Sequence, residues 1–331
     1  MQKFTKTRIL SIILVLLLAT APGIYGQNLK LASDIWPPFT NEAGDVHYAS
    51  DLVNEAFGHM NMKANTTIIE FSEVITGIND GRFDGSAALW KSSKRESYMV
   101  FSDPYLENRL VVVGRKGSPV NYRRLSDLRG KKLALVENYA YGDELDTLKS
   151  VKVIYGKSEQ QCLNMLLSGK ADYILLDQLL AHQLETYQMA EVSKYLVIGD
   201  WPVIINSLHF ALRKDVPEAV QIINQFNKVI DKMLKDGSYN EILNLPYVLS
   251  DVDNDGKIEV VLTAKHSDAA PPTDIYSIMS TPGRLEKQDG QEFYMNGKPY
   301  ESWQAIPNQS PTQAGNYSNN INILNFKLSK K

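Results

Sequence analysis

The chain has little of what several classes of protein need. It contains one cysteine, Cys162, and five histidines among 331 residues. One cysteine excludes an intramolecular disulfide framework and a cysteine-rich zinc site. The sequence contains no HxxxH pair, so it lacks the pattern of a histidine-based catalytic metal site. Lysine and arginine number 35 against 38 aspartate and glutamate residues, so the basic excess typical of nucleic-acid-binding proteins is missing. These absences favour an ordinary globular protein of about two domains.

Long hydrophobic runs are also missing, apart from one near the N-terminus. Residues 9–19 are apolar except for Ser11, follow a basic start, and are broken by Pro22 and Gly23. A membrane-spanning helix needs about 20 apolar residues, so this shorter run is typical of a secretory signal peptide. We expect cleavage after Gly26 and a mature protein in the Gram-negative periplasm. No cysteine lies near the cleavage site to carry a lipid anchor.

Two segments of the mature chain show the same alternation of strands and helices. Strands are predicted at 29–33, 66–71, 83–89, 131–136, 151–155 and 171–176, with helices at 49–62, 74–78, 125–129, 143–148, 158–167 and 178–187. This order predicts mostly parallel sheets flanked by helices. A Gly-basic-x-Asp turn opens a strand in each segment, at residues 81–84 and 169–172. The repeated turn supports two lobes of one architecture.

Two apolar strands, 110–114 and 208–212, bracket the second segment, and an amphipathic helix follows at 217–235. The chain is therefore expected to leave the first lobe, build the second and return, with the two strands as a hinge. The predicted organisation is a signal peptide (1–26), lobe 1 (27–112 and 209–248), lobe 2 (113–208) and a C-terminal extension (249–331).

Several short motifs follow one another between residues 28 and 245. They are Trp36-Pro37-Pro38-Phe39, the two Gly-basic-x-Asp turns, Arg95, Phe101-Ser102-Asp103-Pro104-Tyr105, the segment 125–132 and Asp236-Gly237-Ser238-Tyr239. Together they resemble the family 3 extracellular solute-binding proteins, the periplasmic receptors of polar amino-acid ABC importers. The resemblance implies an α/β fold of the type II-like periplasmic binding proteins, with two lobes on a two-strand hinge and the solute in the cleft.

The same resemblance implies the function. The protein is expected to capture a small polar solute, an amino acid or a related carboxylate, by lobe closure and to present it to an inner-membrane ABC permease. We predict no enzymatic activity, no required cofactor, no nucleic-acid partner and a monomeric state.

Three residues stand where the family contacts its ligand. Arg95 stands at the place of the arginine that grips the ligand carboxylate, which a planar guanidinium can do with two parallel hydrogen bonds. Asp177 stands where an acid takes the amino group, and Trp36 where an aromatic ring stacks on the ligand. The residues alone also allow a solvated surface arginine, an N-cap for the helix beginning at Gln178, and core packing of Trp36 under the prolines.

The sequence departs from the family at two places in the predicted site. Trp90 replaces a hydroxyl that normally binds the carboxylate, and the second-lobe turn that supplies further hydroxyls reads Asn138-Tyr139-Ala140-Tyr141. Ser92 keeps one hydroxyl. We include Trp90, Ser92 and Tyr139 among the predicted ligand-binding residues and expect a smaller pocket or a ligand other than a plain α-amino acid.

The extension contains an acidic loop. Asp251, Asp253 and Asp255 occupy positions 1, 3 and 5, and the Lys257 carbonyl position 7, of a pattern typical of calcium loops, with Glu259 standing in for the missing acid at position 12. The open alternative is a plain hairpin turning at Asp255-Gly256. A second hairpin is predicted around Asn296-Gly297, and the Asn/Gln/Ser/Pro-rich segment 305–320 is expected to be mobile.

Two rival functions stay open. A periplasmic dehydratase on the same fold, similar to cyclohexadienyl dehydratases, would need an acid or base in the cleft, for which Glu137 is the candidate. A ligand-sensing module would instead pass its signal to a partner through the C-terminal tail.

Overall fold

The computed structural model describes residues 28–263, 276–277 and 292–307, apart from 44, 138, 140, 142–144, 146–148, 246 and 253–256. The predicted signal peptide, the predicted helix at 143–148 except Leu145, and most of the segment 305–320 therefore lie outside the described residues. Among the described helices, none combines the length and the apolar character that a membrane span requires.

One mixed sheet of nine strands runs through both lobes, in the order β2-β1-β3-β9-β5-β8-β6-β7 with β4 paired to β9. Its strands are β1 (Asn28–Ser33), β2 (Lys63–Ile68), β3 (Gly85–Trp90), β4 (Met99–Phe101), β5 (Leu106–Arg115), β6 (Lys132–Val136), β7 (Lys152–Gly156), β8 (Tyr173–Asp177) and β9 (Leu196–Arg213). The strands β2-β1-β3 of lobe 1 and β7-β6-β8 of lobe 2 are parallel, as the predicted β-α-β order requires.

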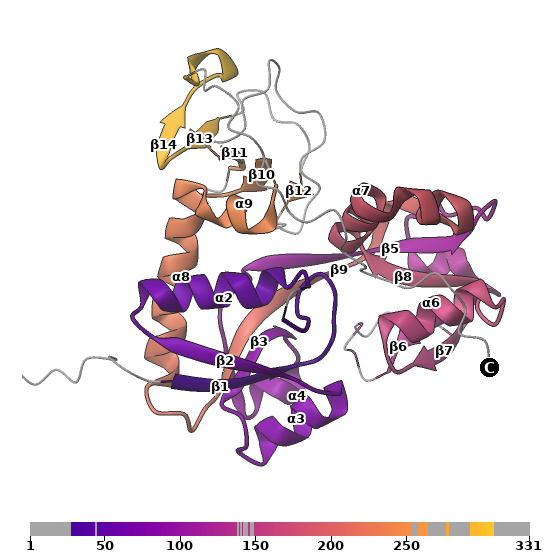
Figure 1. Cartoon of the computed structure of the whole chain (residues 1–331), viewed down its shortest axis with the longest axis horizontal. Coiled ribbons are helices and arrows are strands. Elements are labelled where there is room, and N and C mark those ends of the chain that lie inside the picture. Colours follow the sequence, from indigo (N-terminus) through magenta and orange to yellow (C-terminus); the bar gives the residue numbers. More distant parts are fainter. Residues whose placement is uncertain are drawn as a thin grey trace, which may run out of the picture.

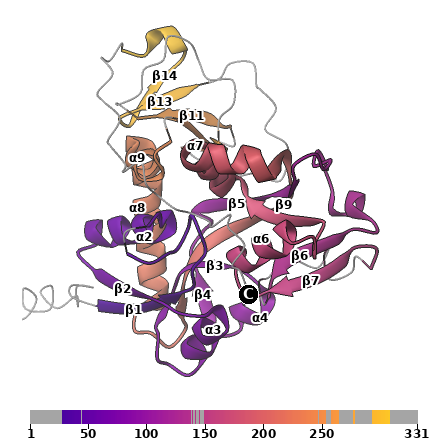
Figure 2. The same ribbon diagram turned by 45° about the vertical axis from the view of Figure 1, so that its right-hand side comes forward.

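Helices cover both faces of each half of the sheet (Figures 1 and 2). Lobe 1 carries α2 (Tyr48–His59), α3 (Phe71–Asn79), α4 (Ser93–Glu96), α8 (Ala219–Asp236) and α9 (Ser238–Leu243), and lobe 2 carries η1 (Leu125–Leu128), α6 (Glu159–Leu167) and α7 (Gln178–Tyr195). Leu31 of β1 packs into the core with α2 and α8, whereas its neighbour Ala32 packs with α3. Successive side chains of a strand point to opposite faces, so one strand serves two apolar layers. Cys162 is buried in α6, as predicted.

The two Gly-basic-x-Asp turns have the same hydrogen bonds. Gly81 and Gly169 have φ of +83° and +77°, a conformation that glycine adopts without strain after a helix. The Asp84 carboxylate accepts the N–H of Lys30 at 2.8 Å, and the Asp172 carboxylate accepts the N–H of Lys132 at 2.8 Å. Each aspartate thus anchors the first strand of its own lobe, and the repeat seen in the sequence is a repeat of contacts.

The strands β5 and β9 connect the lobes and are longer than predicted. They pair antiparallel from Leu106–Leu208 to Arg115–Leu196, and Figure 1 shows them running side by side between the lobes. The first half of β9 escaped prediction because Gly199 and Pro202 interrupt its pattern. The register shifts near Pro202, which is expected because proline cannot donate to a ladder.

The C-terminal extension forms a second sheet with the order β12-β10-β11-β13-β14. Its strands are β10 (Tyr247–Ser250), β11 (Glu259–Leu262), β12 (Tyr276–Ser277), β13 (Phe293–Met295) and β14 (Lys298–Tyr300), and the short helix η2 (Trp303–Ala305) follows. The sheet rests on lobe 1, since Asn240 of α9 donates to the Val261 carbonyl at 2.9 Å. The strands of both predicted hairpins pair antiparallel. The second sheet begins at Tyr247, two residues before the predicted boundary.

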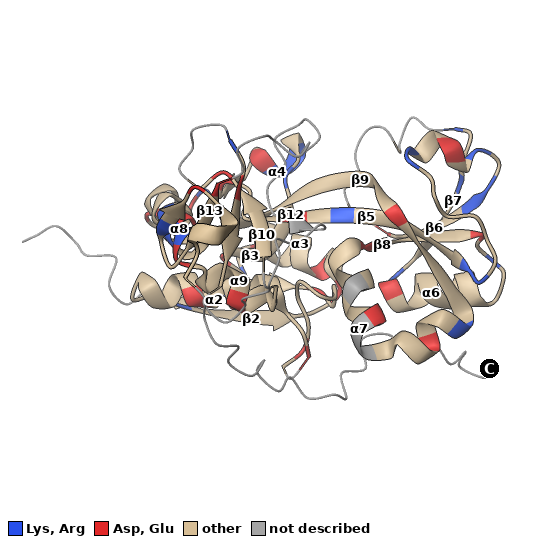
Figure 3. Cartoon of the chain, turned by 90° about the horizontal axis from the view of Figure 1, so that it is seen from above, with Lys and Arg blue, Asp and Glu red and all other residues tan. Residues whose placement is uncertain are grey.

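Figure 3 shows acidic and basic residues in both lobes, as the near-neutral composition leads one to expect.

The pairing of β3 with β9 gives a test of the fold. A Cβ added at Gly85 would lie 1.9 Å from the Ala211 carbonyl oxygen, whereas one added at Gly58 in α2 would meet nothing within 4 Å. We predict that Gly85→Ala destabilises the protein by about 1–3 kcal/mol, because two strands must move apart. Gly58→Ala should stabilise it by up to about 1 kcal/mol. Urea denaturation checks both, and equal stability of the two variants would contradict the β3–β9 register.

Candidate functional site

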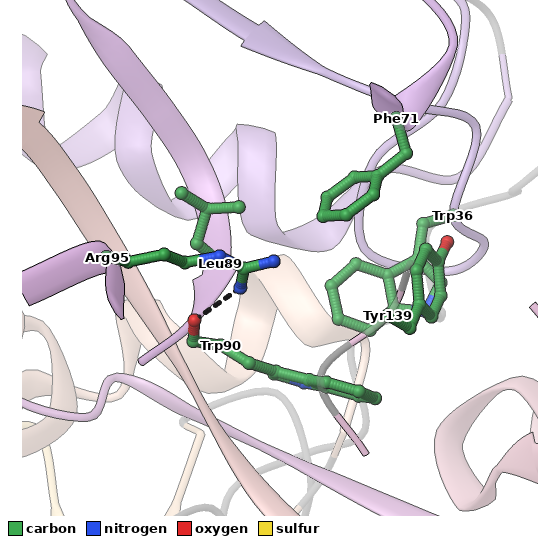
Figure 4. Close-up of a pocket in the computed structure, with 6 residues that line it drawn as sticks. All are labelled: Trp36, Phe71, Leu89, Trp90, Arg95 and Tyr139. Carbon is green, nitrogen blue, oxygen red and sulfur yellow. Dashed lines mark hydrogen bonds between the residues drawn. The ribbon is translucent and has the colours of Figure 1, made fainter. Parts of the chain in front are cut away.

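Four aromatic rings from both lobes meet in the cleft (Figure 4). Trp36 follows β1, Phe71 begins α3 and Trp90 ends β3, all in lobe 1, while Tyr139 follows β6 in lobe 2. The Tyr139 ring centroid lies 5.2 Å from that of Trp36, 5.2 Å from that of Phe71 and 5.7 Å from that of Trp90. These separations are typical of packed aromatic pairs. The cleft is thus lined and largely filled by aromatic side chains.

Trp36 packs in the core and also lines the cleft, while its stacking on a solute stays a prediction. It packs edge-on against Phe39 with centroids 5.0 Å apart, which is the core packing expected beside the two prolines. Its ring also lines the cleft cavity together with Phe71, Leu89, Trp90, Arg95 and Tyr139. That cavity measures only about 10 Å³, near the smallest volume that holds one water molecule. The expectation of a small pocket agrees with this geometry.

Trp90 brings a polar group as well as a ring. Its side chain is 5% exposed, and its indole Nε1 has no hydrogen-bond partner among the described residues. A buried N–H without an acceptor costs about 1–3 kcal/mol. The residue that replaces the family's hydroxyl therefore carries a buried donor that has no acceptor among the described residues.

Arg95 is buried rather than solvated. Its side chain is 8% exposed, its Nη1 donates to the Trp90 carbonyl at 2.6 Å, and its Cζ lies 5.5 Å from the Phe71 ring centroid. Burial lowers the pKa of Arg95 from its usual range. No ion pair joins Arg95 to a carboxylate among the described residues. The surface-arginine interpretation is therefore wrong.

A second, larger cavity of about 370 Å³ also borders Arg95. Its lining comes from lobe 1 alone, namely Phe71, Ser72, Ile75, Ser92, Lys94, Arg95 and Tyr98. Ser92 caps α4, where its hydroxyl accepts the backbone N–H of Arg95 at 3.4 Å. The two charged residues of the lining, Lys94 and Arg95, are both cationic. The surroundings of Arg95 thus favour an anion.

Asp177 is the N-cap that the residue pattern allowed. One of its carboxylate oxygens accepts the Leu179 N–H at 2.7 Å, and the other accepts the Asn108 amide at 2.6 Å and the Arg109 N–H at 2.8 Å. Burial raises the pKa of Asp177 to about 7, and these hydrogen bonds offset part of that effect. Its binding of a solute amino group stays a prediction.

Two further acids at the cleft were missed. Burial raises the pKa of Asp34 to about 6 and that of Glu159 to about 8, with the charges of Asp34 and Asp177 adding to the effect on Glu159. Asp34 follows β1 at the carboxyl end of a parallel strand, a position that could have signalled it. Acidic residues are common in the first turn of a helix, so the sequence contains no signal that Glu159 is buried. Glu137, the acid that the sequence suggested, is exposed.

Hydrogen bonds across the cleft join the lobes. The Tyr139 hydroxyl donates to an Asp34 carboxylate oxygen at 2.8 Å. Burial and the Asp34 charge raise the pKa of Tyr139 well above its usual value, so the phenol keeps its proton for this bond. Gln183 of α7 also donates to the Tyr48 hydroxyl of α2. The lobes are closed on each other in this structure.

The acidic loop of the extension is only partly described. Asp253 and Asp255 lie outside the described residues, Asp251 and Lys257 flank the gap, and the buried Glu259 accepts the Val252 N–H at 2.9 Å. No cluster of three metal-ligating side chains occurs in the part of the chain that the structure describes. The antiparallel pairing of β10 with β11 is confirmed, the predicted turn at Asp255-Gly256 lies outside the described residues, and calcium binding stays a prediction.

The fold and the cleft define a two-lobed binding protein, and comparison with known proteins identifies its family. Residues 29–245 match the bacterial extracellular solute-binding proteins, family 3. This chain belongs to that family, as its motifs predicted. The extension beyond residue 245 lies outside the match.

The chain is also similar to several individual proteins. The L-cystine-binding protein TcyA of Bacillus subtilis is 27% identical over 214 residues, which are 62% of this chain and 76% of TcyA. An ancestral arginine-binding protein bound to arginine superposes with a TM-score of 0.56 at 23% identity, covering 66% of this chain and 96% of that protein. The virulence sensor protein BvgS of Bordetella pertussis is 32% identical over 112 residues, 33% of this chain and 9% of BvgS.

The buried acids predict a pH dependence of stability. Glu159 has a higher pKa when folded than when unfolded, so the folded state holds more protons between about pH 4 and 8, and stability falls as the pH rises through that range. In the wild type, this effect lowers the free energy of unfolding by up to about 1.4 kcal/mol for each pH unit, and Glu159→Gln should abolish it. Urea midpoints at pH 5 and pH 8 measure it, with the exposed Glu137→Gln as control. Identical pH profiles for wild type and Glu159→Gln would contradict the burial of Glu159.

Proposed function

We propose that this protein captures a small carboxylate-bearing solute, an amino acid or a relative, in the periplasm and delivers it to an inner-membrane ABC permease without catalysing a reaction. The observation that carries the proposal is Arg95, whose guanidinium is buried in the cleft of a solute-binding fold with no carboxylate partner among the described residues. Family membership supports the transport role.

The energetics favour a ligand at this arginine. A buried charge without a partner is costly, and an opposite charge with good hydrogen-bond geometry offsets that cost. A solute carboxylate can accept two parallel hydrogen bonds from a guanidinium. Trp90 belongs to the same cavity wall, and its Nε1–H, which has no acceptor among the described residues, would be a further donor for it. Arg95 and Trp90 together would replace the hydroxyl contacts that the sequence lacks.

The acids of the cleft support a solute that also carries a cationic group. Asp34, Glu159 and Asp177 have no ion-pair partner among the described residues. An ammonium group would favour their charged forms and so release protons on binding. The names of the relatives agree with such a zwitterion, since one is an L-cystine-binding protein and another an arginine-binding protein.

We predict that Arg95→Lys weakens solute binding by about 10-fold or more, because lysine cannot form the paired hydrogen bonds of a guanidinium. A thermal-shift panel of amino acids and small organic acids identifies the solute, and titration calorimetry compares the variants. Arg82→Lys serves as the matched control, since Arg82 is exposed and paired with Asp80. Unchanged affinity in Arg95→Lys would refute this assignment.

The enzymatic alternative needs a separate test. A dehydratase would require an acid in the cleft, and the structure contains three, so this criterion does not exclude it. Arogenate and prephenate incubated with the protein should remain unconverted. Turnover that is lost in Glu159→Gln would favour the enzyme instead.

A further inference from the structure

Tyr139 occupies the centre of the solute site. Its ring comes from lobe 2 and lies between Trp36 and Phe71 of lobe 1, at 5.2 Å from each, and Trp90 closes the third side at 5.7 Å. Figure 4 shows these rings gathered beside the guanidinium of Arg95. With Tyr139 in place, the cavity that these rings line between the lobes measures about 10 Å³ and has no room for an amino acid, whereas the cavity of about 370 Å³ beside Arg95 is lined by lobe 1 alone.

Tyr139 makes contacts with only some of the groups that surround it in the cleft. The ring meets the stacking surfaces of its three aromatic neighbours, and the hydroxyl donates to Asp34 at 2.8 Å. Among the described residues, Arg95 has no carboxylate partner and the indole N–H of Trp90 has no acceptor. A phenol has no carboxylate to offer them. Tyr139 therefore fills the space of a solute and meets Asp34, but it pairs with neither Arg95 nor the indole N–H of Trp90.

We propose that Tyr139 is an intramolecular occupant of the solute site, which holds the lobes closed when no solute is bound and which a solute must displace. The inference rests on the proposed function, because it concerns the same cleft. It reverses the role that the sequence suggested for Tyr139, since an occupant competes with the solute whereas a ligand-binding residue assists it.

The contacts that a solute gains in the cleft would offset those that are lost when it displaces Tyr139. A solute that removes Tyr139 breaks one hydrogen bond to Asp34 and separates aromatic contacts. In return it can pair a carboxylate with Arg95 and Trp90 and present a donor or a cation to Asp34. Solutes that lack the carboxylate would lose the contacts of Tyr139 and gain little. Tyr139 would thus act as a specificity-determining residue that rejects weakly complementary ligands.

The first experiment does not depend on knowing the solute. Tyr139→Ala removes the occupant, and 4-methylphenol is a free copy of the side chain. We expect millimolar 4-methylphenol to raise the Tm of Tyr139→Ala by about 2–4 °C. Wild type and Tyr155→Ala, which removes a tyrosine that is 55% exposed in the same lobe, should not respond. An equal response in all three proteins, or none in Tyr139→Ala, would overturn the inference.

The second experiment uses any solute from the thermal-shift panel that binds wild type. Titration calorimetry should show that Tyr139→Ala binds it about 10- to 100-fold more tightly, since a buried ring and a hydrogen bond no longer have to be displaced. Tyr139→Phe, which keeps the ring and loses the bond to Asp34, should fall between the two and guards against a folding defect. Weaker binding by both variants would make Tyr139 an ordinary ligand contact and overturn the inference.

The two proposals fail in different ways. If no carboxylate solute binds either wild type or Tyr139→Ala, the proposed function is refuted, while the response to 4-methylphenol still decides whether the ring site accepts a free ligand.

Discussion

The antiparallel pairing of β5 with β9 is the constraint on which the rest of the structure depends. It places two parallel half-sheets in one continuous sheet and sets their carboxyl-terminal edges facing each other across a cleft. Loops that follow parallel strands therefore meet there, which is where ligands bind in open α/β folds. Trp36 after β1, Trp90 at the end of β3, Tyr139 after β6 and Asp177 at the end of β8 reach the same region for this single topological reason.

The cleft contains buried groups of both charge types. A buried guanidinium lies on the lobe 1 side, and three buried carboxyls lie around the opening between the lobes. Aromatic rings exclude water between them, which strengthens every charge interaction in the cleft. Such a site selects ligands by the positions of their charges, because a ligand that leaves a buried polar group of the site without a partner binds more weakly. The arrangement suits a small solute that carries a carboxylate and a cationic group at separate ends.

Much of the fold could be predicted from the sequence, because local chemistry decides it. Apolar periodicity located the helices, and glycines at Gly81 and Gly169 ended two of them in a left-handed conformation. The missed half of β9 contains a glycine and a proline that only a long partner strand can accommodate.

In the site, Arg95 was placed by its motif, but its burial depends on Phe71 and Trp90 from other elements. Glu159 was missed because its burial and the nearby charges of Asp34 and Asp177 depend on the tertiary fold, which no local pattern records. For Tyr139 the sequence showed an aromatic at an unusual place and could not show that the ring crosses to the other lobe.

We infer that the cleft is a solute site closed on Tyr139, and a crystal structure of the protein with the tightest-binding solute of the panel would decide the matter. The solute carboxylate should lie within hydrogen-bond distance of Arg95, and the Tyr139 ring should be displaced from between Trp36 and Phe71. A solute bound elsewhere, or bound in the cleft with Tyr139 still between those two rings, would contradict it.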